Sequence, residues 1–242
     1  MNNFLVYRNK IRSGVRPVIG HPINIDHFLT QGLVGHWTFN EGDGSYAYDY
    51  SGHNNKGTLT NGPTWTTLST NEKVLSFDGS SNYVNCGNDA SLNITDAITI
   101  AAWVNHKGAD YFQRVVSKNV FEAYGLIIDP NNKPLFKFYT TALRELFSSK
   151  VAARNEWHHI VATYDKDAGT NNTRIYVDAV LGNMNSFTGA IATNNKYLLI
   201  GRDPSQSQVW FNGFIDDVRI YNRALSAGEI QYLYTKTQAR YK

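Results

Sequence analysis

A series of short alternating segments separated by turn signals constrains this chain more than any other feature. After Leu33, about eleven stretches alternate apolar and polar residues, among them "KVLSFDG", "AITIAAWVNH" and "EWHHIVATYD". Turn sequences such as "DG", "GTNN" and "DPNNK" separate them, and alternation with a period of two predicts half-buried β-strands. Only "SAGEIQYLYTKTQARYK" is typical of a helix, with Ser226 and Glu229 spaced as a capping box. The sequence therefore predicts an all-β sandwich or jelly roll, and the lack of crossover helices excludes a parallel sheet.

Composition and charge narrow the class of protein. The chain has 242 residues, of which 42% are hydrophobic, and this is enough for one large β-sandwich. The formal net charge of +3 is small and dispersed, so we expect no nucleic acid partner. No apolar run approaches the roughly 20 residues that span a bilayer, so we expect no membrane partner. The single cysteine, Cys86, excludes an internal disulfide and is predicted to be a small buried residue.

Residues 1–31 form a separate segment, and we expect the jelly-roll domain to occupy residues 32–242. Basic and apolar residues alternate from Arg8 to Arg16, and two prolines that follow interrupt any long helix. This pattern predicts an extended N-terminal arm that docks onto other copies of the chain, giving a homo-oligomer, or onto other subunits of a particle. The segment lacks the continuous apolar stretch of a signal peptide. We therefore expect synthesis in the cytoplasm without one.

Five linked motifs resemble the concanavalin A-like LamG (laminin G-like) jelly-roll family. In the family's order they are "LVGHWTFNEGDGSYAYDYSGHNNKGTL", "VLSFDGSSNYVNCGNDASLNITDAITIAAWV", "EWHHIVATYD", "IYVDAVL" and "GFIDDVRIYNRAL". The match covers roughly residues 33–235 and departs from the family at Ala179, where a glycine usually forms a turn. The resemblance implies an antiparallel two-sheet jelly-roll sandwich in which the first and last long strands pair.

Two adjacent carboxylates, Asp216 and Asp217, begin the last strand pattern. Alternation places Asp216 inward with Val218 and Asp217 on the opposite face. An inward carboxylate needs a partner, because burying an unpaired charge costs several kcal/mol. The strand pairing that the resemblance implies would place Glu41 beside Asp216, with Asp49 nearby, and related β-glucanases hold a structural calcium near their paired terminal strands. We therefore expect a structural Ca²⁺ held by these three carboxylates; the alternative is an Asp216 cap or arginine pair without metal.

The same residues argue against catalysis. Glycanases that share the fold carry an E-x-D-x-E-type motif on one concave strand, and the sequence contains no such motif. Adjacent carboxylates on opposite faces make a poor acid and base pair for glycoside hydrolysis. The consecutive His158 and His159 also face opposite ways on a strand, so they do not easily chelate one ion. We expect a non-catalytic protein.

Two loops carry residue types that bind sugars. Lectin sites stack apolar sugar faces on Trp or Tyr and fix the hydroxyl groups with Asn, Asp and Arg. The candidate glycan-binding residues are Arg202, Asp203, Trp210 and Asn212 in "GRDPSQSQVWFNG", and Tyr111 and Arg114 in "HKGADYFQR". The competing interpretation is ordinary loop polarity around a core tryptophan.

Two functions from different classes follow. The segment "RPVIGHPINIDHFLTQGLVGHW" is similar to leaders of LamG-like proteins encoded by tailed bacteriophages. This similarity implies a structural or decoration protein on a virion surface, capsid or tail, that docks through its arm and displays a jelly roll toward cell-surface glycans. The alternative is a soluble calcium-dependent lectin module, and a glycan-active enzyme is the weakest of the three hypotheses.

Overall fold

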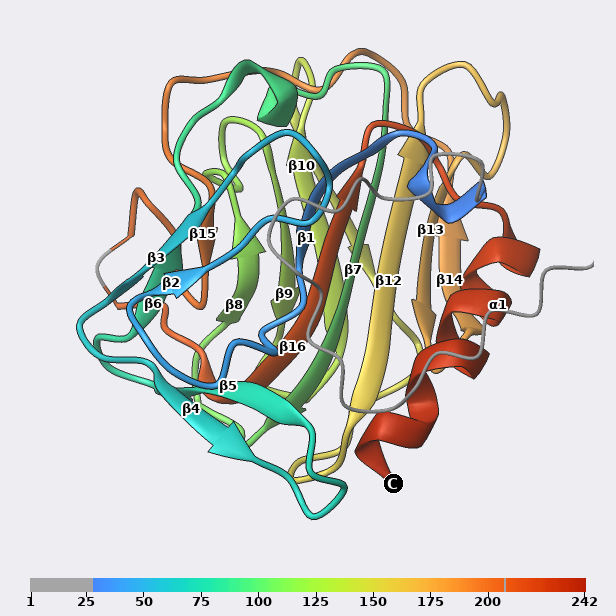
Figure 1. Cartoon of the computed structure of the whole chain (residues 1–242). Coiled ribbons are helices and arrows are strands. Elements are labelled where there is room, and N and C mark those ends of the chain that lie inside the picture. Colours follow the sequence, from blue (N-terminus) through green and yellow to red (C-terminus); the bar gives the residue numbers. More distant parts are fainter. Residues whose placement is uncertain (1–27, 207) are drawn as a thin grey trace, which may run out of the picture.

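The chain forms two stacked antiparallel sheets and one short C-terminal helix (Figure 1). The structure is a computed structural model that describes residues 28–206 and 208–242, so most of the expected arm, residues 1–27, lies outside the described residues. The first sheet contains, in spatial order, β14 (Val180–Asn185), β13 (Thr173–Val177), β12 (His158–Asp165), β7 (Ala97–His106), β16 (Asn212–Tyr221), β5 (Lys73–Asp78) and β4 (Thr64–Thr67), with β1 (Leu33–Trp37) also paired to β16. The all-β two-sheet fold predicted from the sequence is confirmed.

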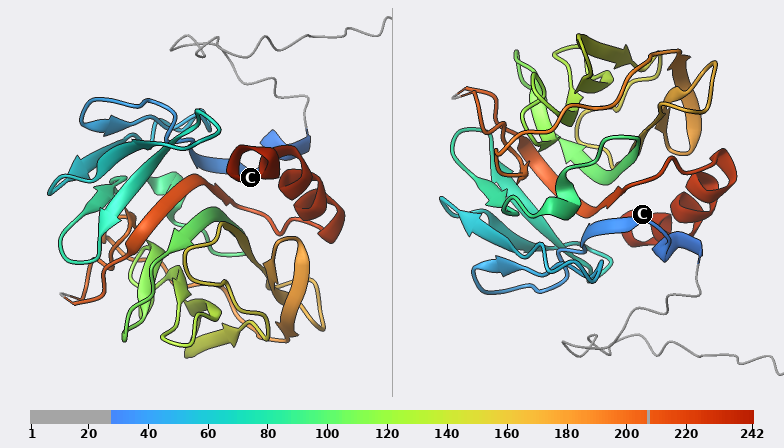
Figure 2. Two further views of the ribbon diagram at one scale, coloured as in Figure 1. Left: turned by 90° about the horizontal axis from the view of Figure 1, so that it is seen from below. Right: turned by 90° about the horizontal axis from the view of Figure 1, so that it is seen from above.

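The second sheet lies across the main core from the first, as the end-on views of Figure 2 show. It contains, in spatial order, β11 (Leu143–Phe147), β10 (Pro134–Tyr139), β9 (Tyr124–Ile128), β8 (Gln113–Ser117), β15 (Leu199–Ile200), β6 (Tyr83–Asn85), β3 (Gly57–Thr60) and β2 (Tyr46–Ala47). The helical elements are η1 (Phe28–Thr30), η2 (Ala90–Leu92), α1 (Ala227–Thr237) and η3 (Gln238–Tyr241). None of the helices in the described part of the chain is long and apolar enough to cross a membrane.

The central strand β7 is buried on both faces. Ile98, Ile100 and Ala102 point into the main core between the sheets. On the opposite face, Ala101 belongs to a second apolar cluster, which is completed by Leu29, Leu33, Val161, Tyr176, Tyr221, Leu225, Ile230 and Leu233. Since Leu225, Ile230 and Leu233 come from α1 and the residues before it, the helix covers the outer face of the first sheet.

Helix α1 begins where its sequence signal places it. The Ser226 hydroxyl accepts a hydrogen bond from the Glu229 N–H, and the Glu229 carboxylate accepts one from the Ser226 N–H, so the predicted capping box is present. Ile230 and Leu233 are one turn apart and turn their side chains onto the sheet. The helix is therefore fixed at its first turn and along one face.

The first and last long strands pair, as the resemblance implies. Strand β1 runs antiparallel to β16, with Trp37 opposite Val218. The Trp37 side chain is fully buried, and its indole N–H donates to the Asn55 carbonyl at 2.8 Å. Cys86 is also buried and is a free thiol in the main core, as predicted.

Ala179 takes the turn conformation that the family usually gives to glycine. It joins β13 to β14 with φ of +61°, after Asp178 with φ of +52°. A left-handed conformation costs a non-glycine residue about 1–2 kcal/mol. The departure therefore strains one hairpin turn and leaves the pairing of β13 with β14 in place.

The packed domain begins before the boundary expected at residue 32. Leu29 is only 7% exposed and packs in the second apolar cluster with Leu33 and the helix. The Gly32 carbonyl accepts a hydrogen bond from the Asn222 N–H. Residues 28–31, which the sequence assigned to the arm, are thus part of the folded body.

Candidate functional site

A β-bulge in β16 places Asp216 and Asp217 on the same face of the sheet. The register with β7 shifts between Asp216 and Arg219, and Asp217 has a positive φ of 45°. Ile215 and Val218 both point into the main core, so the two residues between them lie on the outer face. A bulge adds one residue to a strand and so breaks its period of two. The prediction that Asp216 points inward and opposite to Asp217 is therefore wrong.

Asp217 lies at the centre of a buried ionic cluster. Its Oδ1 accepts a hydrogen bond from Arg219 Nε at 2.9 Å and lies 2.8 Å from His36 Nε2, while its Oδ2 accepts from Arg219 Nη2 at 3.2 Å. Burial favours the neutral acid, but Arg219 and His36 outweigh it and hold the pKa of Asp217 well below its usual value. The carboxylate is therefore a charged partner inside the fold.

Asp216 is fully buried, and its partners come from the C-terminal end of the chain. Its Oδ2 accepts a hydrogen bond from the Tyr241 hydroxyl at 2.6 Å and lies 3.0 Å from Arg240 Nη2. Burial raises the pKa of Asp216 well above its usual value, against the opposing effect of Arg240. Arg240 and Tyr241 are therefore the partners of Asp216.

Aromatic rings pack around Tyr241, the residue that binds Asp216. The Tyr241 ring stacks on Trp103, with centroids 4.2 Å apart, and lies 4.7 Å from the Trp157 ring. The Trp103 indole N–H donates to the Thr237 hydroxyl at 2.9 Å, and the His159 ring packs 5.1 Å from Trp103. The acids therefore lie beneath the chain's own C-terminal segment, and they join that segment to β16.

The contacts of the three expected calcium ligands do not fit one metal site. Both oxygens of Asp49 are taken by hydrogen bonds from its own turn and from the His36 N–H. Glu41 accepts from the Tyr48 N–H, and Asp216 faces the C-terminal segment. The described residues hold no group of three or more His, Cys, Asp or Glu side chains that could bind a metal ion. Calcium binding stays a prediction, which melting in EDTA and in added calcium would test.

Arg202 and Trp210, two of the expected glycan-binding residues, lie together with Tyr83. The Arg202 guanidinium carbon is 4.4 Å from the centroid of the Trp210 ring and 5.1 Å from that of Tyr83. The two rings are 6.3 Å apart, and all three side chains are half-buried. We call Tyr83, Arg202 and Trp210 the aromatic clamp. Tyr83 was missed because strand alternation marks it only as a residue facing outward from β6.

Asp203 and Arg114 form the framework behind the clamp. Asp203 is fully buried, accepts a hydrogen bond from the Ser117 hydroxyl at 2.7 Å and lies 3.6 Å from Arg114 Nε. Arg114 is 3% exposed and also donates to the Phe112 carbonyl. Their partners are within the protein, so these two residues position the loop after β15.

Tyr111 and Asn212 both contact Gly79, in the turn that follows β5. The Tyr111 hydroxyl donates to the Gly79 carbonyl at 2.8 Å, and Gly79 has no room for a Cβ because the Asn212 side chain lies against it. Phe211 connects this turn to the clamp, since it accepts from the Gly79 N–H and donates to the Gly201 carbonyl. The structure thus brings the six predicted residues to one group of loops, where Asp203 and Arg114 are buried and the other four side chains are half-buried.

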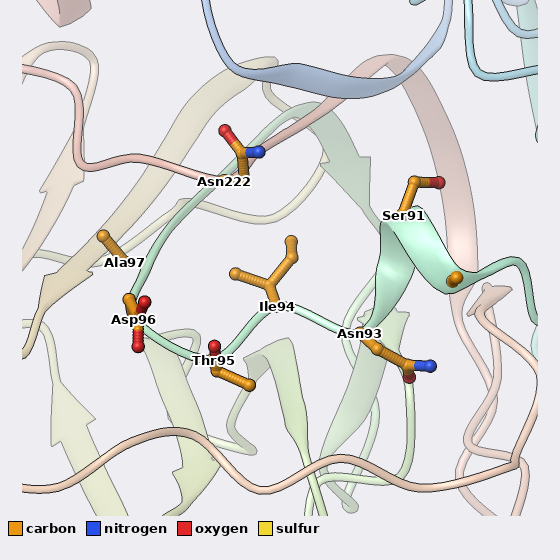
Figure 3. A pocket seen from close by; sticks show the side chains of 8 residues that line it. Ser91, Asn93, Ile94, Thr95, Asp96, Ala97 and Asn222 are labelled. Atoms are coloured by element: carbon orange, nitrogen blue, oxygen red, sulfur yellow. The ribbon is translucent and has the colours of Figure 1, made fainter.

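A second surface feature is a shallow hollow of about 280 Å³ at the start of β7 (Figure 3). Figure 3 shows Asn222 on the side opposite Thr95. The lining residues are Ala90, Ser91, Asn93, Ile94, Thr95, Asp96, Ala97 and Asn222. The hollow offers hydroxyl and amide groups but no aromatic ring, so it lacks the stacking surface that sugar sites use.

Comparison with protein-family models places most of the chain in one family. The model described as the concanavalin A-like lectin/glucanases superfamily, Laminin_G_3, matches residues 78–231. That range includes every residue of the clamp and both bulge carboxylates. The comparison with curated protein sequences gives no match.

Two of the solved structures with a similar fold are binding domains of toxins. The binding domain of Paraclostridial Mosquitocidal Protein 1 has a TM-score of 0.71 and 16% identity, with 86% of this chain and 53% of that chain covered. The binding domain of botulinum neurotoxin serotype G has a TM-score of 0.66 and 14% identity, with 86% and 51% covered. This chain therefore spans about half the length of the toxin domains, and at these identities the likeness shows the fold alone.

A third similar structure matches over nearly its whole length. Domain 4 of AbnA, a GH43 extracellular arabinanase from Geobacillus stearothermophilus, was solved in complex with arabinotriose. Its TM-score is 0.66 with 16% identity, and the alignment covers 84% of this chain and 98% of that chain. The unit of similarity is thus one whole jelly-roll domain.

Proposed function

Because the chain belongs to the concanavalin A-like lectin/glucanase superfamily, we propose that it is a non-catalytic module that binds glycans through the aromatic clamp. The observation that carries the proposal is the half-exposed Trp210 held beside Arg202 and Tyr83. Aromatic rings bind the apolar faces of sugars, and a few fixed polar groups orient them. The similar structures add support, since one of them is a domain solved with an arabinose oligosaccharide.

The position of the adjacent acids supports a binding role over a catalytic one. Asp216 and Asp217 are 0% and 3% exposed and are paired with arginines of the same chain. A glycosidase needs two carboxyl groups flanking the scissile bond. These carboxyl groups are instead buried beneath the C-terminal segment.

A glycan array followed by calorimetric titration of the hits tests the proposal. We expect Trp210→Ala to weaken the binding of the hits by tenfold or more, because it removes the ring on which a sugar face would stack. For comparison, stacking of one nucleic-acid base on an aromatic ring contributes about 1–3 kcal/mol. The control is Phe121→Ala, which removes an aromatic ring that is 41% exposed and lies outside the clamp. Bound glycans should be recovered intact. Equal binding by wild type and Trp210→Ala would contradict the assignment of the site.

We also propose that the domain is a decoration or structural protein of a virion surface, docked through its N-terminal arm. Support comes from the leader sequence and from the alternation of basic and apolar residues in the first 27 residues. The described chain begins at η1, where Leu29 packs on the domain. An arm attached there would be anchored at its base, and ordering the rest must be offset by a sizeable interface.

Light scattering after size exclusion tests the docking role. The full chain is compared with one that starts at Phe28, so that Leu29 and Leu33 keep their contacts in the second apolar cluster. We expect the full chain to form a defined oligomer and the shortened chain to be a monomer with an unchanged melting temperature. Two monomers would contradict self-assembly through the arm and favour the lectin alternative.

A further inference from the structure

The guanidinium of Arg202 has no hydrogen-bond or ion-pair partner in the part of the chain that the structure describes. No hydrogen bond or ion pair joins its side chain to another described residue, and its Nε is buried without an acceptor. A buried donor without a partner costs about 1–3 kcal/mol. Arg202 is nevertheless held in place, because the rings of Tyr83 and Trp210 lie against its guanidinium.

Asp203 and Asp78, two carboxylates of the neighbouring loops, have partners of their own. Asp203 accepts hydrogen bonds from Ser117 and Ser205 and lies beside Arg114. Asp78 accepts hydrogen bonds from the N–H groups of the turn that follows it, residues 80–82. Neither carboxylate neutralises Arg202, so its positive charge stays available to an external anion.

We propose that Arg202 binds an anionic group of the glycan, so that the ligand of the clamp is an acidic saccharide bearing a carboxylate. The inference rests on the proposed glycan-binding function and names the class of sugar. A guanidinium is a planar fork whose paired N–H groups match a carboxylate. The flanking rings fix the plane of that fork before binding, which reduces the entropy lost when the anion docks.

The clamp also offers an apolar surface for the ring of such a sugar. Trp210 and Tyr83 are half-buried, so part of each ring remains as an apolar surface next to the cation. A pyranose that bears a carboxylate has an anionic edge and an apolar C–H face, and these match the cation and the rings. Uronic and sialic acids share this chemistry.

Paired saccharides that differ in one charged group test the inference. The probes are trigalacturonate with its methyl ester, and sialyllactose with lactose, each titrated into the full chain by calorimetry. We expect at least tenfold tighter binding of the carboxylated member in one pair, which also identifies the source of the carboxylate. The preference should weaken as sodium chloride is raised, because exposed charges are screened.

Substitution separates this role from general damage to the fold. Arg202→Gln should abolish the preference for the carboxylated probe while leaving the melting temperature unchanged. Arg144→Gln is the matched control, since Arg144 also lies over an aromatic ring, Phe187 at 5.6 Å, outside the clamp. It should keep the preference.

The possible outcomes distinguish a failure of the acidic-sugar inference from a failure of the proposed glycan binding. Equal binding of both members of each pair, with Arg202→Gln behaving as wild type, would overturn the acidic-sugar inference and leave glycan binding in place. A preference for carboxylated probes that survives Arg202→Gln would overturn the role of Arg202. If no glycan binds on the array or in the titrations, both the proposed function and this inference are overturned.

Discussion

Replacing Asp217 by asparagine is expected to lower the free energy of unfolding by about 3–5 kcal/mol, the usual effect of removing one member of a buried ion pair. Asp217 holds Arg219 through two hydrogen bonds and lies 2.8 Å from His36 Nε2, with 2% of its side chain exposed. Asparagine keeps the shape of the side chain and tolerates the positive φ at this position. The loss would therefore report the missing charge, measured by urea denaturation at neutral pH.

A surface ion pair supplies the control for this experiment. Lys166 lies 2.8 Å from Asp167, and the two side chains are 29% and 76% exposed. Lys166→Met should change stability by less than about 1 kcal/mol, because exposed pairs contribute little. An Asp217→Asn variant within 1 kcal/mol of wild type would contradict the structural role given to the bulge carboxylates.

Acidification is expected to destabilise the protein through His159. Its side chain is 1% exposed and its Nδ1 has no hydrogen-bond partner, so a protonated ring would bury a charge. Burial lowers the pKa of His159 from 6.5 to about 4. The unfolded chain then takes up a proton at higher pH than the folded protein does. The stability that His159 contributes is complete above pH 6.5 and is lost as the pH falls to about 4.

The expected size of this loss is about 3 kcal/mol, since one pKa unit corresponds to 1.36 kcal/mol. The measurement is the free energy of unfolding from pH 7 to pH 4 for wild type and for His159→Gln. Their difference isolates His159 from the other buried titrating groups. Wild type should lose its advantage over the variant, or reverse it, across this range. A constant difference from pH 7 to pH 4 would show that His159 does not titrate in this way.

Much of the fold could be predicted from the sequence, because the alternation, capping and turn patterns indicate the same elements that the structure contains. The apolar residues of β7 occupy both of its faces, and the structure gives each face its own apolar cluster. The capping box fixes the start of α1 from Ser226 and Glu229 alone. Turn signals place the ends of the strands, and the pairing of β1 with β16 follows from the family resemblance.

The orientation of the bulge carboxylates could not be predicted from alternation. Alternation with a period of two assumes a strand that pairs without interruption. The bulge at Asp217 adds a residue to the strand, and no turn signal in the sequence marks it. The partners of Asp216 are also far from it in the sequence, because Arg240 and Tyr241 follow α1. No local pattern around Asp216 could indicate them. Asp216 lies on the outer face of the sheet, where it contacts the C-terminal segment.

The candidate glycan site was predicted by residue type and resolved by structure. Sequence placed Arg202 and Trp210 in one loop but could not show that Asp203 and Arg114 are buried against each other. It also could not bring Tyr83 to the loop, since that contact depends on β6 lying next to β15. Residue type therefore pointed to these loops, and the strand order of the second sheet shows which of their side chains lie together.

The most direct test of the account is to map a bound glycan onto the protein by backbone NMR. A glycan identified on the array is titrated into isotope-labelled full chain, and the shifted amide signals are assigned to residues. We expect the shifts to concentrate around Tyr83, Arg202 and Trp210. Shifts concentrated in the hollow around Thr95 and Asn222, with the clamp unchanged, would contradict it.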